Sequence, residues 1–502
     1  MLGSVDSCVL AGLDVRRVHV EADIGRGESK FIVVGLATPS VKEARDRVRS
    51  AVVNSGFEFP RSRLTVNLAP AELRKDGAGL DLPMAVAIVL ARLQMTPPDR
   101  SAFVGELALD GTVRHVDGVL VASRGLRGLG YERIFVPSGD ADEAALVEGL
   151  EVIPCASLGS VIGHLTGTES IEPRAPTLES SSSAGTAELD LAEVHGQEEA
   201  KRALEVAAAG GHHLLMSGPP GAGKTMLARC LPGVLPPLEL HEALEVAQVR
   251  SLLGELPREH PLDWVRPFRA PHHSISTAGL IGGGTGLAMP GEISRANRGV
   301  LFLDELAEFH APVLQALRQP LESGRISITR SGGSVAYPAR FTLVAATNPC
   351  PCGWAGDSIR TCRCSPGAID TYQRRLSGPL LDRIDLQVSV RRVPLDALAS
   401  EPRGEPSATV RERVVEARRR QLERQGCLNA QLKPARLRQV SALGGSSRRT
   451  LERWSAQRGF SARGFHRAWR VARTAADLAG SDEIQEQHVL EALGFRLQDA
   501  AA

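Results

Sequence analysis

A glycine-rich loop carries the clearest chemistry in the sequence. It reads Gly-Pro-Pro-Gly-Ala-Gly-Lys-Thr, follows a short apolar run at 214–216 and precedes a stretch that can start a helix. Glycines let backbone N–H groups turn toward phosphate oxygens, and the helix adds the positive end of its dipole. The strand–loop–helix setting argues against a turn that merely contains Lys-Thr. The predicted nucleotide-binding residues are Gly218, Pro219, Pro220, Gly221, Ala222, Gly223, Lys224 and Thr225.

The end of this loop and one later segment predict ATP and Mg²⁺ as cofactors. Lys224 supplies a positive charge for the β- and γ-phosphates, and the hydroxyl of Thr225 is a ligand for Mg²⁺. The apolar run 299–303 ends in Asp304 and Glu305. We expect Asp304 to hold Mg²⁺ through water and Glu305 to orient and deprotonate the attacking water. A buried strand with an exposed acidic end is the alternative, and the phosphate loop upstream favours the catalytic interpretation.

Asn348 and Arg383 extend the predicted hydrolytic site. Asn348 follows a third apolar run, 341–347, and its amide suits holding the attacking water. Arg383 follows Leu-Leu-Asp at a helix end. An arginine presented to the γ-phosphate of a neighbouring subunit accelerates turnover by roughly a thousandfold or more. An ion pair with Asp382 or Asp385 of the same chain is the alternative, and the sequence does not separate the two.

Arg463 begins a further predicted helix that runs through residue 479. From that position we expect it to reach back over the nucleotide. The whole segment 396–502 is predicted to be helical.

Four cysteines crowd into one short segment. They form the pairs Cys350/Cys352 and Cys362/Cys364. Four thiolates suit tetrahedral Zn²⁺, although C-x-C pairs are tighter than the usual C-x₂-C spacing. Structural zinc is the favoured interpretation over free or redox-active cysteines.

Two basic features are candidate partner contacts. The segment 324–337 alternates, turns and alternates again, which predicts a β-hairpin with Arg325 and Arg330 beside its first strand. These arginines suit a phosphate backbone, and solvated edge charges are an equal alternative. His272 and His273 lie in a long insertion with no third metal ligand nearby. A partner-contacting loop and a purely structural turn are both open for them.

The chain of 502 residues is long enough for several domains. Residues 1–168 alternate strand-like and helix-like stretches, and 169–188 is a polar linker rich in Pro and Ser. Residues 189–395 hold the nucleotide site, and 396–502 form the helical end. The predicted fold class is α/β.

Composition excludes some classes of protein. The net charge is only +1, which argues against a chain-wide polycationic surface but leaves local basic surfaces open. The longest apolar run, 82–91, is too short to cross a bilayer, and no signal peptide is recognisable. A chain that uses ATP belongs in a reducing compartment, so we expect a cytoplasmic protein without a membrane partner and without a disulfide framework.

Together these segments resemble an AAA+ ATPase, here a P-loop core with a helical C-terminal lid. The resemblance is closest to the magnesium-chelatase-like ComM/YifB family. It rests on Pro-His-His-Ser at 271–274, Pro-Gly-Glu-Ile-Ser at 290–294, Asn-Pro-Cys-Pro-Cys-Gly at 348–353 and Ser-Ala-Arg-Gly at 461–464.

Residues 1–168 are similar to that family's Lon-protease-like α+β domain, with Val-Gly-Leu at 34–36 and Val-Lys-Glu-Ala-Arg at 41–45. Active Lon proteases carry a Ser after a Lys-Asp-Gly turn and a Lys after a Gly-Val pair. Here the matching segment 75–80 has no Ser, and Leu120 stands where the Lys would be. Without nucleophile and amine base there is no acyl-enzyme route, so we expect no protease activity.

What the resemblance implies is a homo-oligomeric motor, a hexamer, that promotes branch migration on branched or single-stranded DNA during natural transformation. Related helicases carry a hairpin before the Asn strand that lines the pore. By that analogy Arg325 and Arg330 would line the pore here, with the insertion around His272 and His273 beside them. A protein-remodelling ATPase is the alternative. Such pores usually expose an aromatic residue, and this hairpin has Tyr337 only late in its second strand. A chelatase-type motor subunit is a third, weaker alternative.

Overall fold

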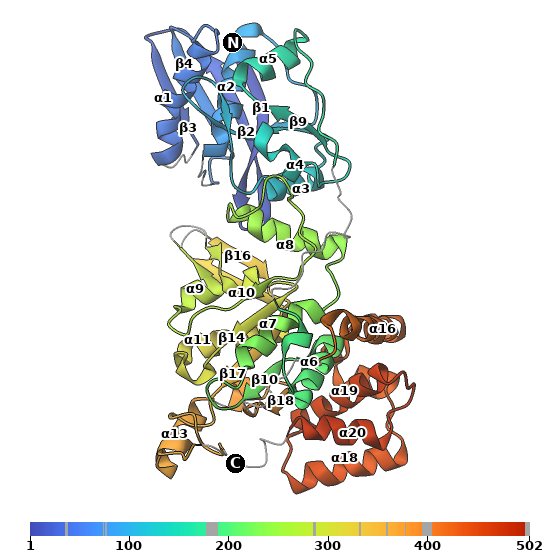
Figure 1. Cartoon of the computed structure of the whole chain (residues 1–502). Coiled ribbons are helices and arrows are strands. Elements are labelled where there is room, and N and C mark those ends of the chain that lie inside the picture. The colour runs from blue at the N-terminus through green and yellow to red at the C-terminus, as the bar shows by residue number, and fades with distance from the viewer. Residues whose placement is uncertain are drawn as a thin grey trace.

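The computed structural model describes residues 1–35, 39–73, 75, 78–176, 189–284, 288–330, 333–357, 360–376, 378–393 and 404–496. Figure 1 shows the chain as a stack, with the N-terminal sheet at one end, a second sheet in the middle and the C-terminal helices beside and beyond that sheet. This arrangement confirms the predicted α/β class with a helical C-terminal region.

The first sheet is mixed and has seven strands in the order β3-β4-β2-β1-β5-β8-β9. Its central helix, α2, is buried along nearly its whole length because its residues are apolar on every side. Gly3 lets this helix approach β1, since a Cβ there would lie 2.5 Å from the carbonyl oxygen of Ala87. The strands are β1 Leu2–Ala11, β2 Asp14–Ile24, β3 Lys30–Val34, β4 Arg63–Ala69, β5 Ser101–Phe103, β8 Arg133–Pro137 and β9 Glu151–Cys155. The helices and short strands are α1 Pro39–Asn54, α2 Asp81–Leu93, β6 Glu106–Leu107, β7 Val113–Arg114, α3 Val119–Gly128, α4 Ala141–Ala144 and α5 Leu158–Thr166.

The second sheet is parallel, with the order β11-β14-β17-β10-β18. Its three central strands, β14, β17 and β10, are short and almost entirely buried on both faces, as parallel strands covered by helices must be. Because all of them run in one direction, the phosphate loop and the predicted catalytic segments meet at one edge. The strands are β10 Leu214–Ser217, β11 Phe268–Arg269, β14 Val300–Leu303, β17 Thr342–Thr347 and β18 Leu386–Ser389.

Helices and two small hairpins surround this sheet. The hairpin predicted at 324–337 is present as β15 Arg325–Arg330 and β16 Gly333–Pro338, paired in register from Arg325 opposite Pro338. A second, shorter hairpin joins β12 Gly282–Gly283 to β13 Met289–Pro290. The helices are α6 Glu198–Gly210, α7 Lys224–Val234, α8 Leu240–Leu252, α9 Thr277–Ile281, α10 Glu292–Arg295, α11 Ala311–Ala316, α12 Arg318–Ser323, α13 Pro366–Arg375 and α14 Gly378–Leu381.

The C-terminal helices share one hydrophobic core with α6, α7 and the second sheet. Apolar residues of α19, such as Ala468 and Val471, are fully buried against that core. These helices therefore form a docked lid in this conformation, with α16 Ser407–Gln425, α17 Pro434–Val440, α18 Gly445–Gln457, α19 Ala462–Leu478 and α20 Glu486–Gly494.

The layer of the first sheet contacts the layer of the second sheet through helices α3 and α8, which lie between the two sheets (Figure 1). Helix α3 packs on α8, where the N–H of Gly118 donates to the Ser251 carbonyl at 2.9 Å and Arg124 donates to Gln248 at 2.9 Å. Beside them, the turn between β1 and β2 reaches the hairpin β15–β16, since a Cβ on Gly12 would lie 3.2 Å from the Tyr337 hydroxyl. The N-terminal layer thus rests on both the α8 segment and the hairpin.

Part of the predicted linker 169–188 belongs to the first layer. Arg174 lies beside β9. Its backbone N–H donates to the Val152 carbonyl at 2.8 Å, and its side chain forms an ion pair with Asp142. Residues 177–188 lie outside the described residues. Within the described ranges every helix is too short or too polar to span a lipid bilayer.

Candidate functional site

The phosphate loop lies between the carboxyl end of β10 and the start of α7. Gly221 and Gly223 adopt φ values of +75° and +90°, in the region that favours glycine. Lys224 folds back into the loop and donates to the carbonyl oxygens of Gly218 at 2.5 Å and Pro219 at 3.0 Å. Burial lowers the pKa of Lys224, while the charges of Asp304 and Glu305 oppose that shift. A phosphate would give this buried ammonium group a negatively charged partner in addition to the two carbonyl oxygens.

Asp304 lies directly across from the loop, at the end of β14. The Thr225 hydroxyl donates to Asp304 Oδ2 at 2.8 Å. These two oxygen-bearing side chains, in direct contact beside the phosphate loop, fit the hard-oxygen coordination of Mg²⁺. The residues present therefore suit a magnesium nucleotide.

Asn348 follows β17, the strand between β14 and β10. Its Oδ1 accepts a bond from Lys224 Nζ at 3.2 Å. The register explains this meeting, because Ser217 pairs with Thr347 and the two chains leave the sheet side by side. The structure thus brings together the predicted residues Lys224, Thr225, Asp304 and Asn348.

Glu305 has a partner that the sequence did not reveal. The residue adopts the left-handed conformation with φ +51°, and His273 Nδ1 lies 3.6 Å from its carboxylate. The rings of His272 and His273 lie 4.0 Å apart. The His-His segment follows β11, which pairs with β14, so its loop emerges beside the acidic end of that strand. His273 therefore contacts the catalytic edge, while a later part of the same insertion contacts the hairpin, where the Tyr337 hydroxyl donates to the Ala288 carbonyl.

The four cysteines form one cluster immediately after Asn348. All four Sγ atoms lie within 4.8 Å of one another, and Cys350, Cys352 and Cys362 are 3.4 to 3.6 Å apart in pairs. A zinc tetrahedron with bonds of about 2.3 Å has sulfur–sulfur edges of about 3.8 Å, whereas a disulfide needs about 2.05 Å. N–H groups of Ala355 and Cys364 donate to two of these sulfurs at 3.3 and 3.4 Å. The set fits a tetrahedral metal ion.

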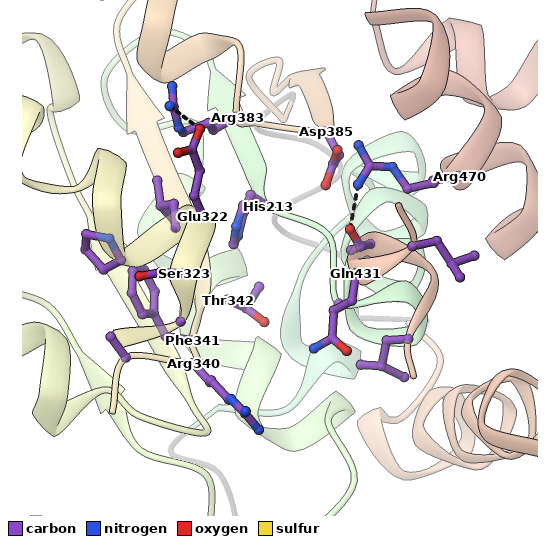
Figure 2. A pocket seen from close by; sticks show the side chains of 18 of the residues that line it. His213, Glu322, Ser323, Arg340, Phe341, Thr342, Arg383, Asp385, Gln431 and Arg470 are labelled. Atoms are coloured by element: carbon purple, nitrogen blue, oxygen red, sulfur yellow. Dashed lines mark hydrogen bonds and ion pairs between the residues drawn. The ribbon is translucent and has the colours of Figure 1, made fainter. Parts of the chain in front are cut away.

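The opposite edge of the second sheet borders a cavity of about 860 Å³ between the sheet and the lid. Residues at the amino ends of the strands, among them His213 and Thr342, line one side, and lid residues such as Gln431 and Arg470 line the other (Figure 2). Arginines outnumber carboxylates in the lining, so the cavity suits an anion. Its basic residues are Arg266, Arg298, Arg340, Arg383, Arg418, Lys433, Arg463, Arg467 and Arg470.

Arg383 and Arg463 both lie in this cavity, away from the phosphate loop of their own chain. Arg383 pairs with Glu322 (Figure 2). Arg463, at the start of α19, is exposed and lines the lid side. A strand of four to six residues separates the two edges by about 13–20 Å. The sequence predicted that Arg463 would reach back over the nucleotide. The structure instead places Arg463 at the edge of the sheet opposite the phosphate loop of its own chain.

Asp385 fastens the lid to the sheet beneath this cavity. It lies 3.2 Å from His212 Nδ1, and His212 Nε2 contacts the Thr474 hydroxyl of α19 at 2.8 Å. Burial would raise the pKa of Asp385, but the His212 hydrogen bond and nearby cationic groups hold it well below its ordinary value. The neighbouring His213 accepts the Leu343 N–H at 3.0 Å. Burial lowers the pKa of His213 to about 4, so its imidazole is neutral at pH 7.

The hairpin β15–β16 has one buried and one exposed face. Ile326, Ile328 and Tyr337 are buried, and the Tyr337 hydroxyl donates to the Ala288 carbonyl at 2.6 Å. Arg325 and Arg330, at the two ends of β15, are both exposed, although their spacing of five residues directs them to opposite faces of the strand. The aromatic residue is therefore held in the interior, while the two arginines face solvent.

Comparison with known proteins gives matches along the whole chain. Residues 190–398 match the family described as magnesium chelatase, subunit ChlI, residues 20–140 match subunit ChlI of Mg-chelatase, and residues 404–496 match its C-terminal family. Competence protein ComM of Haemophilus influenzae is 45% identical over 99% of this chain and 97% of its own length. The uncharacterized protein YifB of Escherichia coli is 43% identical with the same coverage. The magnesium-chelatase 67 kDa subunit of Heliobacterium mobile is 30% identical over 38% of this chain.

Proposed function

The chain belongs to the magnesium-chelatase-like family of ComM and YifB, and we propose that it is a ring-forming, ATP-hydrolysing motor that acts on branched DNA during competence. The observation that carries the ATPase part is the meeting of Lys224, Thr225, Asp304 and Asn348 at one sheet edge. The similarity to competence protein ComM over almost the full length supports the biological role.

In this proposal ATP lies between two subunits. One subunit provides the phosphate loop, Asp304, Glu305 and Asn348, and its neighbour provides Arg383. Two observations support this division. Arg383 lies at the edge of the sheet opposite its own phosphate loop, and it belongs to an arginine-rich cavity. We also assign Arg463 to the neighbour's half of the site, because it lines the same cavity. A hexamer is the ring that the family resemblance implies.

Within the site, each residue has a separate task in hydrolysis. Lys224 and Thr225 would hold the triphosphate, and Thr225 with Asp304 would hold its Mg²⁺, which would supply positive charge to the phosphates. Glu305 accepts a proton from the attacking water once the carboxylate has left His273, and Asn348 holds that water in line. Arg383 stabilises the charge that develops on the transferred phosphoryl group.

DNA contact is assigned to Arg325 and Arg330, which are exposed at the two ends of β15. Their support is exposure combined with a fixed backbone, since Ile326 and Ile328 of the same strand are buried. A pore that threads polypeptide would present an aromatic residue, and Tyr337 is instead buried. That burial favours DNA over a protein substrate.

The N-terminal layer is proposed as a docking domain without protease activity. Leu120, at the position of the Lon lysine, is buried against Ala247 of α8. The segment that would carry the amine base thus serves the contact between the two layers. We also propose a structural zinc ion on the four cysteines and a cytoplasmic location for the activity.

The deciding experiment is an ATPase and branch-migration assay of the purified protein on a synthetic four-way junction. Hydrolysis that accelerates with the junction and junction movement that requires ATP are the expected results. A Glu305→Gln variant should bind ATP and DNA but move no junction. If ATP is hydrolysed while four-way and forked DNA neither bind nor accelerate the reaction, a protein-remodelling role becomes the better explanation. Failure of metal insertion into a porphyrin would separately exclude the chelatase role.

A further inference from the structure

The segment that carries the four cysteines touches the phosphate loop directly. Gly353 has φ +81°, and a Cβ there would lie 2.6 Å from Cδ of Pro220. The close approach is one that only glycine allows. From the other side, Arg392 donates to the Pro220 carbonyl at 3.4 Å. Two segments, the turn after β17 and the end of β18, therefore hold the same residue of the phosphate loop.

Trp354 joins these two segments to each other. Its indole ring is packed between two guanidinium groups, with Arg360 at 4.7 Å and Arg392 at 4.5 Å from the ring centroid. Arg392 also pairs with the buried carboxylate of Asp357 at 3.6 Å. The backbone N–H of Arg360 donates to the same carboxylate at 2.7 Å. Each of these contacts depends on the position of the cysteine-bearing segment.

The described part of that segment has no helix or strand of its own. Residues 350–357 and 360–364 consist of turns and irregular backbone. Cys350 is buried and the other three cysteines are half-buried, with their sulfur atoms directed to one centre. A bound ion is what would fix such a short irregular segment, because metal binding supplies the ordering free energy that regular structure cannot.

We propose that zinc held by Cys350, Cys352, Cys362 and Cys364 braces the phosphate loop, so that the affinity for ATP depends on zinc. The inference rests on the zinc ion in the proposed function. With zinc bound, Gly353 and Trp354 keep Pro220 and Arg392 in place and the loop is ordered before ATP arrives. Without zinc, the binding of ATP must also order the loop, which weakens the observed affinity.

The first test measures zinc content and ATP affinity on the full-length protein. We expect about one zinc per chain. A zinc-selective chelator, used with Mg²⁺ in excess, should reduce the affinity for a fluorescent ATP analogue at least fivefold, and added zinc should restore it. Cys427→Ser is the control, because Cys427 lies outside the cluster, and it should keep both zinc and affinity. The proposal would be overturned if protein purified under reducing conditions contained no zinc. It would also be overturned if removing the zinc did not change the affinity for the ATP analogue.

A second pair of variants separates the brace from general loss of folding. Trp354→Leu and Arg392→Ala leave the four ligands intact, so they should retain zinc and still bind ATP several-fold more weakly than the wild type. Unchanged affinity in both variants would overturn the brace even if zinc is present. These measurements contain no DNA. A negative result here would therefore not argue against the proposed action on DNA. In the same way, a protein that hydrolyses ATP without responding to DNA would not argue against the role of zinc in ATP binding.

Discussion

At the scale of single residues, Lys224 is the group whose role the structure defines most directly. It is buried, and it donates to two loop carbonyls and to Asn348. We expect Lys224→Ala to abolish ATP binding and hydrolysis, because the triphosphate loses its main counter-charge. Equilibrium binding of a fluorescent ATP analogue is the measurement. Lys30→Ala, on an exposed strand of the first sheet, should behave as wild type. Normal ATP binding by the Lys224 variant would contradict the site.

His273 offers a second residue-scale prediction. Its Nδ1 lies 3.6 Å from the Glu305 carboxylate, and in the proposed mechanism this contact would hold the carboxylate away from the attacking water. Since the pair is partly exposed, it contributes at most about 1 kcal/mol, which corresponds to at most about fivefold in rate. We expect His273→Ala to raise DNA-free ATP hydrolysis within that limit. His272→Ala is the matched control and should leave the DNA-free rate unchanged. A fall in the rate would mean that His273 supports catalysis rather than restraining it.

His213 predicts how stability depends on pH. Its pKa is lowered from an ordinary 6.5 to about 4, so between these values the unfolded chain binds more protons than the folded one. Stability should therefore be lost as pH falls from 6.5 toward 4. His213→Gln keeps an acceptor for the Leu343 N–H and should show a flatter loss over that range in urea titrations at several pH values. The exposed His241→Gln should retain the wild-type slope. Identical slopes for all three proteins would refute the assignment.

At the scale of elements, the hairpin β15–β16 should separate DNA stimulation from basal hydrolysis. Its buried face fixes the backbone, so Arg325→Ala with Arg330→Ala removes charge without removing packing. We expect DNA affinity to fall about tenfold and the salt dependence of binding to become shallower, because phosphate contacts are lost. DNA-free hydrolysis should not change. Anisotropy titrations with labelled junction at several salt concentrations measure both effects.

The matched control for the hairpin is the double variant Arg92→Ala and Arg100→Ala. Those two arginines are exposed on the first layer, where each pairs with a surface glutamate. If both double variants lose the same affinity, the effect comes from overall charge and the hairpin has no special place in DNA binding.

At the scale of the whole molecule, the placement of Arg383 predicts complementation between subunits. Arg383→Ala and Lys224→Ala should each be inactive as pure proteins. In an equal mixture, about a quarter of the sites would combine an intact loop with an intact arginine, if the arginine acts on a neighbour. We therefore expect the mixed rings to regain measurable ATP hydrolysis. A mixture as inactive as its components would place Arg383 in the site of its own chain or outside catalysis.

The sequence by itself predicted the nucleotide-binding loop, the strands that carry the neighbouring site residues and the absence of a Lon dyad. Lys224, Thr225, Asp304 and Asn348 follow apolar runs, and parallel strands necessarily deliver their carboxyl ends to one edge. Local patterns suffice here because spacing along the chain fixes each residue at a strand end. The hairpin and the buried helix α2 were predictable for the same reason, since alternation and continuous apolarity are local signals.

Only the tertiary structure decided which distant segments touch. His273 meets Glu305 because β11 pairs with β14, and Arg463 joins Arg383 because the lid docks on the opposite edge of the sheet. The contact of Gly353 and Arg392 with Pro220 likewise joins segments that are far apart in sequence. No periodicity encodes such meetings. They arise from how layers pack, and packing depends on the shapes and charges of all the surfaces together.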